Sequence, residues 1–106
     1  MNTEDLVPLG DVLTRLDGPL TFARFLIGER ERAGMTQSAA GKKLGISRQM
    51  VCDIEKGRQP VSVELAAKIA KTLKVSPTVA IEACLQDQLR RAHMKYTVTV
   101  AATKRA

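Results

Sequence analysis

Aromatic residues are scarce in this 106-residue sequence, which contains two Phe, one Tyr and no Trp. The core must therefore be built from Leu, Ile, Val, Ala and Met, a set that suits packed helices better than a β-sandwich. A chain of this length fits one domain and buries enough surface for one hydrophobic core. The composition predicts a single domain of the all-α class.

Metal-ligating residues are also few. Cys52 and Cys84 are 32 positions apart, no CxxC pair is present, and His93 is the single histidine. A zinc site needs more ligands near one another, so no metal is expected. The sequence has no nucleophile motif and no glycine-rich phosphate loop, so we expect neither an enzyme nor a cofactor.

Long apolar runs are absent. No stretch of about 18 apolar residues is present to span a membrane. The N-terminus opens with acidic residues rather than with the basic and then apolar segments of a signal peptide. We therefore expect a soluble, cytoplasmic protein with no membrane partner, in which both cysteines are free thiols.

Charge is distributed unevenly along the chain. The formal net charge is +6, but residues 1–18 hold four acidic residues and one basic residue, which leaves a net charge of +9 for residues 19–106. A basic domain favours polyanions such as nucleic acid or an acidic membrane, although a solvated surface alone explains many basic proteins. We interpret residues 1–18 as an acidic lead-in with a short helix at 11–16.

Five further helices are predicted from apolar residues at helical spacing and from signals at the helix ends. The first opens at Pro19 or Thr21 and ends at Gly34. The other four are expected over 37–43, 48–56, 63–73 and 77–92.

The second and third of these helices are short and sharply delimited. Thr36 is the expected N-cap of the second helix, and Gly45 supplies the left-handed conformation that ends it. Ser47 is the expected N-cap of the third helix, and Gly57 ends it. Isolated helices of this length are unstable in water, so neighbours must hold them. Two short helices joined by a Leu-Gly-Ile turn form a helix-turn-helix pattern.

The C-terminal segment, residues 93–106, changes period. The stretch "KYTVTV" places Tyr96, Val98 and Val100 on one face, which is strand spacing. Because no other strand is predicted, the backbone of this one would stay unpaired unless a second copy supplied a partner. We therefore expect an intermolecular ribbon across a two-fold axis, with these three residues as dimer contacts. The alternative is a frayed tail.

Residues 34–76, "GMTQSAAGKKLGISRQMVCDIEKGRQPVSVELAAKIAKTLKVS", resemble the lambda-repressor-like helix-turn-helix regulators (Cro/C1 type, XRE family). In that family "TQ" opens the scaffold helix and "GISR...IE.G" is the recognition helix. The resemblance implies a five-helix DNA-binding domain over residues 19–92. It also implies that the recognition helix enters the major groove of DNA with its N-terminal residues on base edges.

Candidate DNA contacts follow from the resemblance and from the helical faces, because Val51 and Ile54 are expected to face the core. These candidates are Thr36, Gln37, Lys43, Ser47, Arg48, Gln49, Met50, Cys52, Asp53, Lys56 and Arg58.

The roles of these residues differ. Arg48 can bind guanine and Gln49 can bind adenine, each through two hydrogen bonds. Asp53 either accepts from a cytosine amine or only restrains Arg48 or Gln49. Cys52 fits contact with a thymine methyl group better than redox sensing. The family pattern places Gln37 at the positive end of the second helix, next to phosphate. The basic candidates contact the DNA backbone or are ordinary solvated charges.

Three residues depart from the family pattern. Gly41 stands where alanine is usual, Ala40 where leucine is common, and Glu29 where an apolar residue is common. Glycine inside a helix costs about 1 kcal/mol relative to alanine. We therefore expect a looser scaffold, although a very small residue suits a close helix crossing. Glu55 is expected to be structural, bonded to Arg30 or to backbone groups.

The resulting functional prediction is a homodimeric transcriptional regulator, with repression favoured over activation, that binds a double-stranded operator with two-fold symmetry. Two alternatives stay open. Chain size and layout resemble those of antitoxins, which implies a toxin protein as a partner of residues 1–18 or of the tail. A purely protein-binding adaptor built on the same fold would show no DNA preference.

Overall fold

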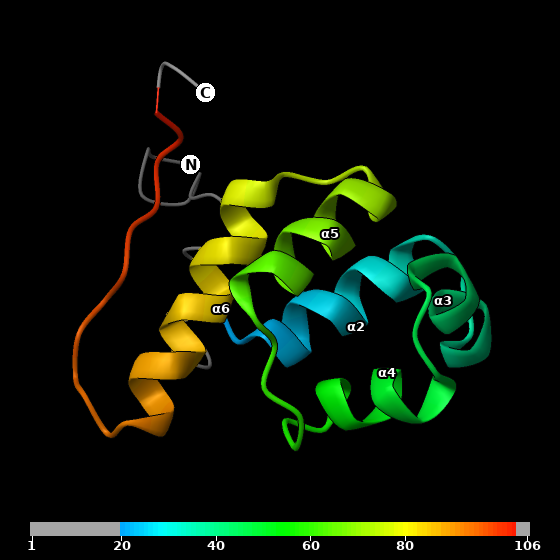
Figure 1. Ribbon diagram of the computed structural model, residues 1–106, viewed down its shortest axis with the longest axis horizontal. Coiled ribbons are helices and arrows are strands. Elements are labelled where there is room, and N and C mark those ends of the chain that lie inside the picture. The colour runs from blue at the N-terminus through cyan, green and yellow to red at the C-terminus, as the bar shows by residue number, and fades with distance from the viewer. Residues whose placement is uncertain (1–19, 104–106) are drawn as a thin grey trace, which may run out of the picture.

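The computed structural model describes residues 20–103, which contain five helices (Figure 1). These helices are α2 (Phe22–Arg32), α3 (Gln37–Leu44), α4 (Arg48–Glu55), α5 (Val63–Leu73) and α6 (Pro77–Arg91). The all-α fold and the five helices predicted for this part of the sequence are confirmed, with ends that differ by one or two residues. The acidic lead-in and its helix at 11–16 lie outside the described residues.

Hydroxyl side chains start the helices at the predicted positions. The hydroxyl of Thr36 accepts the N–H of Ala39 at 3.0 Å, and the hydroxyl of Ser47 accepts the N–H of Met50 at 3.0 Å. Each bond satisfies one of the N–H groups that a helix leaves unpaired in its first turn. Gly45 ends α3 with a φ of 74°, a left-handed conformation that glycine adopts without strain. The two short helices are therefore fixed at their ends by local hydrogen bonds.

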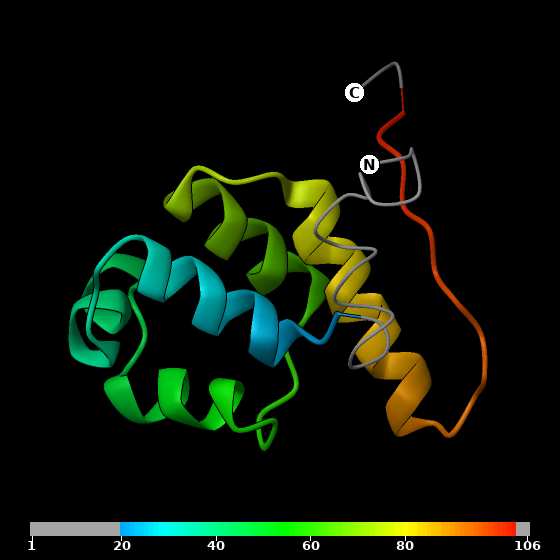
Figure 2. The same ribbon diagram turned by 180° about the vertical axis from the view of Figure 1, so that it is seen from behind.

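Helix α2 lies in the middle of the bundle. In both views α4 runs below it, α5 lies above it, α3 packs at its C-terminal end and α6 crosses near its N-terminal end (Figures 1 and 2). Apolar side chains from all five helices and from the loop before α5 form one buried cluster. This cluster consists of Phe22, Phe25, Leu26, Leu44, Val51, Ile54, Val61, Ala66, Ile69, Ala70, Ala80, Ala83 and Cys84. None of the described helices is both long enough and apolar enough to cross a membrane.

Gly41 corrects the expectation of a looser scaffold. It is buried in α3, and a Cβ at this position would lie 2.7 Å from the carbonyl oxygen of Ile46. The N–H of Ile46 donates to the carbonyl of Gly41 at 2.9 Å, which draws the turn back over the helix. The turn therefore packs so closely on α3 that the absence of a side chain is required.

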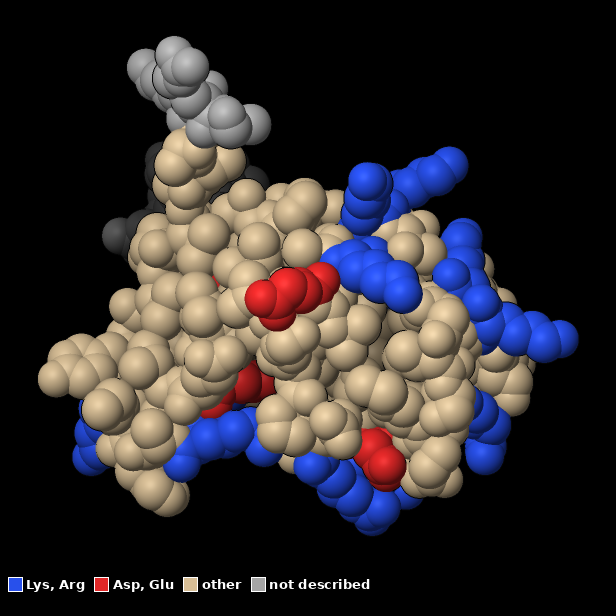
Figure 3. All heavy atoms as spheres, viewed as in Figure 1, with Lys and Arg blue, Asp and Glu red and all other residues tan. Residues whose placement is uncertain are grey.

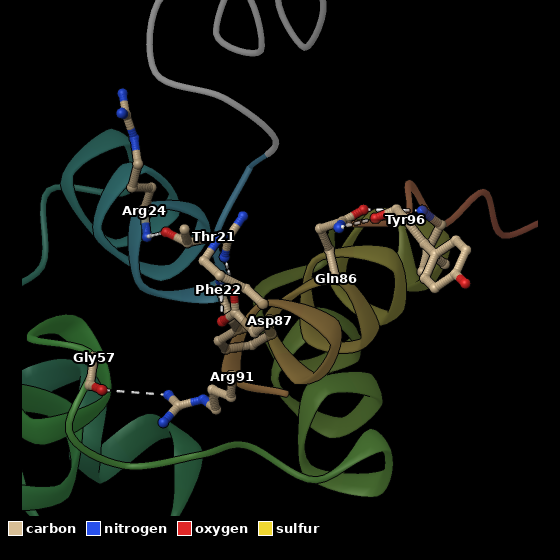
Figure 4. A network of polar contacts seen from close by, with 10 residues as sticks. Thr21, Phe22, Arg24, Gly57, Gln86, Asp87, Arg91 and Tyr96 are labelled. Atoms are coloured by element: carbon tan, nitrogen blue, oxygen red, sulfur yellow. Dashed lines mark hydrogen bonds and ion pairs between the residues drawn. The ribbon is translucent and has the colours of Figure 1, made fainter. Parts of the chain in front are cut away.

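The strand expected in the C-terminal segment is absent from the described residues. Residues 95–103 belong to neither a helix nor a strand. The side-chain amide of Gln86, itself buried in α6, donates to the carbonyl of Tyr96 at 2.7 Å and accepts the N–H of Val98 at 2.9 Å (Figure 4). Glu82 accepts the N–H of Val100 at 3.0 Å. The premise of the ribbon was that a second copy must pair this backbone, and that premise is wrong because α6 does so within the chain.

Candidate nucleic-acid interface

The outer face of α4 is exposed because two apolar side chains hold its inner face. Val51 is 0% exposed and Ile54 is 2% exposed, and both pack in the core beneath α2. Arg48 and Gln49, in the first turn, are exposed. The sequence prediction of which side of α4 faces inward is confirmed. A helix of eight residues is thus held by its neighbours while its N-terminal end meets solvent.

The candidate residues divide into two groups. Thr36, Lys43, Ser47, Arg48, Gln49, Lys56 and Arg58 are exposed, whereas Gln37, Met50, Cys52 and Asp53 are half-buried. Thr36 and Ser47 use their hydroxyls as N-caps. Met50 packs against the core cluster, so less of it faces solvent than of its neighbours in the first turn. The structure places most of the exposed group on α4, at its N-cap and in the loop that follows it.

Asp53 connects α4 to that loop. Its carboxylate accepts a hydrogen bond from the amide of Gln49 at 3.0 Å and lies 3.9 Å from the guanidinium of Arg58. Its backbone carbonyl accepts the N–H groups of Arg58 at 2.8 Å and Gln59 at 3.2 Å. Of the two roles left open for Asp53, these contacts match restraint of Gln49, one turn earlier on the same face.

Glu55 anchors the C-terminal end of α4. Its carboxylate accepts two hydrogen bonds from the guanidinium of Arg30, at 2.6 and 3.1 Å, and a third from the amide of Gln37 at 3.1 Å. Arg30 also donates to the carbonyl of Met35 at 2.9 Å. The hydrogen bond that Arg30 donates to Glu55 raises the pKa of Arg30 above its ordinary value. The predicted pairing of Glu55 with Arg30 is confirmed, and it ties α4 to α2.

Gln37 is the third member of this network, and its position modifies the prediction made for it. The residue is half-buried at the first position of α3, and its amide donates to Glu55, 18 positions later in the chain. The family pattern predicted a contact of Gln37 with phosphate, and the structure adds a hydrogen bond from Gln37 to the C-terminal end of α4. The sequence carries no signal for this pairing, because it depends on how α3 and α4 cross.

A hollow lies where the C-terminal ends of α4 and α6 meet. Its volume is about 330 Å³, and its lining includes Lys56, Gly57, Asp87, Arg90 and Arg91. The guanidinium of Arg91 donates to the carbonyl of Gly57 at 3.3 Å, as Figure 4 shows. Arg91 was not among the residues predicted to contact DNA. The two basic residues at the end of α6 were its only signal.

Comparisons with known proteins agree with this geometry. A helix-turn-helix family model, HTH_3, matches residues 28–79. An uncharacterized HTH-type transcriptional regulator of Methanothermobacter thermautotrophicus is 41% identical over 51 residues, which is 47% of this chain and 74% of that protein. This chain belongs to the HTH_3 family of helix-turn-helix transcriptional regulators.

Other relatives of this HTH_3 regulator match over shorter shares of their length. An uncharacterized HTH-type transcriptional regulator of Methanocaldococcus jannaschii is 54% identical over 37 residues, which is 35% of this chain and 56% of that protein. The chain therefore spans little more than half the length of that relative. The match to the family implies DNA binding through the helix-turn-helix.

Solved structures share the fold. The restriction-modification controller protein C.AhdI of Aeromonas hydrophila superposes with a TM-score of 0.52 and 27% identity, over 56% of this chain and 86% of that one. An HTH_3 family transcriptional regulator of Vibrio cholerae gives a TM-score of 0.52 and 26% identity, over 64% of this chain and 37% of that one. A hypothetical transcription factor of Neisseria, at 21% identity, shares the fold with a TM-score of 0.54.

Basic side chains of the HTH_3 regulator gather along the lower, right-hand and upper right margins of the face in Figure 3, over α4, α3, α5 and the C-terminal end of α6 as Figure 1 places them. The surface along the middle of α6 is largely uncharged in this view. Positive charge beside an exposed helix end attracts the DNA backbone. Positive charge is therefore present beside α4, and also over α5.

The two cysteines of the regulator differ in burial. Cys84 is buried and its thiol donates to the carbonyl of Val61 at 3.0 Å, and burial raises the pKa of this thiol. Cys52 is half-buried on α4. Within residues 20–103 no group of three or more His, Cys, Asp or Glu side chains is arranged to hold a metal ion.

Proposed function

We propose that this regulator is a sequence-specific repressor that binds double-stranded DNA as a homodimer, with α4 in the major groove. The observation that carries the proposal is the orientation of α4. Its inner residues Val51 and Ile54 are fully buried, and its N-terminal Arg48 and Gln49 are exposed. Helices placed in this way read base edges in helix-turn-helix proteins.

Base reading is assigned to the first turn of α4. Arg48 presents a planar fork of donors that fits O6 and N7 of guanine, and Gln49 fits N6 and N7 of adenine. Asp53 holds the amide of Gln49 at 3.0 Å and so limits its rotation. Cys52, half-buried beside them, suits contact with a thymine methyl group.

Backbone contacts surround this reading surface. The N-terminal end of α3 offers backbone N–H groups and the exposed Thr36 to a phosphate, while Gln37 positions α4. Lys43, Lys56 and Arg58 are exposed near the two ends of the helix-turn-helix and supply positive charge. Such contacts give affinity and register without reading sequence.

Two copies would read a two-fold operator whose half-sites lie about one helical turn apart. Two apolar side chains that follow α6 are exposed, Met94 at 52% and Tyr96 at 68% of their surface, and are available for a contact between copies. The ribbon is no longer needed for this contact, since Val98 and Val100 are paired through their backbone with α6. The antitoxin alternative depends on residues outside those described or on this paired tail, so no described contact favours it.

Selection of bound fragments from a random DNA pool tests the proposal. The enriched site should be a two-fold related sequence, and binding to it should weaken steeply with salt through counterion release. Arg48→Ala should abolish preference at one base pair in each half-site, costing about 1–3 kcal/mol there. Lys43→Ala should weaken binding to all sequences alike. Enrichment of no sequence would refute the proposal and support the adaptor alternative. Identical behaviour of the two variants would refute the assignment of base reading to Arg48.

A further inference from the structure

The C-terminal end of α6 lies on the same side of the molecule as α4. Figures 1 and 2 both show this end of α6 level with α4 and with the loop that follows α4. The hydrogen bond from Arg91 to the carbonyl of Gly57 joins the two elements directly across 34 positions of sequence. Arg91 is exposed, so its guanidinium extends the basic surface of α4 onto a different helix.

The acidic residues of the hollow between these elements are already compensated. Glu55 accepts two hydrogen bonds from Arg30. Asp87 accepts the N–H of Phe22 at 3.0 Å, at the positive end of α2, and pairs with Arg90 at 2.7 Å. After this pairing, Lys56 and Arg91 are the two cations of the lining that exceed its acidic residues in charge. An anion entering the hollow therefore meets net positive charge.

Backbone carbonyls at a helix end would normally repel an anion. Here the last carbonyls of α6 are engaged. The carbonyl of Gln88 accepts the N–H of Ala92, that of Leu89 accepts the N–H of Met94, and that of Arg90 accepts the N–H of His93. On the opposite wall of the hollow, the guanidinium of Arg91 donates a hydrogen bond to the carbonyl of Gly57. These hydrogen bonds occupy four of the carbonyl oxygens at this end of the molecule.

We propose that this hollow binds a phosphate of the DNA backbone beside the bases read by α4, held by Arg91 and Lys56. A guanidinium carries five donors in a planar fork that matches phosphate oxygens, and one of them already fixes Arg91 beside the loop. The contact extends the footprint past the helix-turn-helix itself. This inference rests on the proposed DNA binding and adds a second element, α6, to it.

The test measures the affinity of the full chain for the selected operator between about 50 and about 200 mM salt. Arg91→Gln and Lys56→Gln should each reduce the slope of log K against log salt by about 0.9, the value for one lost phosphate contact. Arg91→Lys should recover much of the slope. Lys71→Gln is the matched control, because Lys71 is an exposed cation in the last turn of α5 and lies outside the lining of the hollow.

Phosphate ethylation interference locates the contact. One ethylated phosphate in each half-site should impair the wild type but not Arg91→Gln, and the selected base sequence should be the same for both. If Arg91→Gln has the slope of Lys71→Gln and keeps the full interference pattern, the inference is wrong while the proposed function stands. If the wild type itself shows no salt-dependent operator binding, both are wrong.

Discussion

Replacement of Glu55 by Gln tests how the reading helix is held. The carboxylate of Glu55 is 5% exposed and receives three donors, two from the guanidinium of Arg30 and one from the amide of Gln37. Gln has nearly the same shape but presents an NH2 group in place of one oxygen. At least one of the three hydrogen bonds then becomes a contact between two donors, and the largely buried charge of Arg30 loses its counter-ion.

The magnitude follows from burial. Removing one partner of a buried ion pair costs about 3–5 kcal/mol, because the other charge stays uncompensated. The side chain of Arg30 is 15% exposed and retains some access to water, so we expect the lower end of this range, about 3 kcal/mol. In a chain of this size each kcal/mol lowers Tm by about 4–8 °C. Glu55→Gln should therefore lower Tm by roughly 15 °C.

Thermal and urea unfolding followed by far-ultraviolet circular dichroism measure the effect. Glu64→Gln is the matched control, since Glu64 is exposed in the first turn of α5 and contributes about 1 kcal/mol or less through the helix dipole. If the two variants lose similar stability, the network does not hold α4 in the way described here. A large loss of stability in both variants would show that the cause is the change in net charge of the protein.

Two further substitutions test local features of the fold. Gly41→Ala should destabilise the protein by about 1 kcal/mol in urea unfolding. Overpacking against the carbonyl of Ile46 costs about 1–3 kcal/mol, which exceeds the helix-propensity gain of about 1 kcal/mol. A variant more stable than the wild type would contradict the close approach of the turn to α3. Burial raises the pKa of Cys84, so the folded state binds that proton more tightly. The stability that results is complete below the unfolded thiol pKa of about 8.5 and is lost as pH rises above it. From about pH 7 to about pH 10 the free energy of unfolding should fall more steeply for the wild type than for Cys84→Ala, and parallel profiles would exclude this role.

Local signals in the sequence were sufficient to predict the helices. The caps Thr36 and Ser47 and the left-handed Gly45 act within a few residues of themselves, so their effects appear directly in the sequence. Apolar spacing likewise identified Val51 and Ile54 as the inner face of α4, because burial follows the helical period. The helices and the inner face of α4 therefore needed no information about distant contacts, whereas the candidate DNA contacts also depended on the family resemblance.

Polar contacts between distant residues could not be predicted in this way. The pairing of Gln37 with Glu55 depends on the crossing of two helices, and a periodic pattern says only which face is apolar. The alternation of the tail predicted a strand, which the described residues do not form, because only another strand was considered as a partner for its backbone. A side-chain amide such as that of Gln86 carries one donor and one acceptor site side by side, so it pairs with the backbone of Tyr96 and Val98 as a neighbouring strand would.

Under the proposed function the two ends of α4 have separate tasks, and this separation explains how so short a helix can serve recognition. The C-terminal end carries Glu55, which is bound to α2 and α3, and the N-terminal end carries Arg48, which is exposed. Rigid attachment at one end fixes the position of the other without covering it. Weakening Glu55 should therefore lower affinity for every DNA sequence while base preference persists, whereas loss of Arg48 should change preference while stability persists. A regulator whose reading helix were held through its N-terminal residues could not separate these two properties.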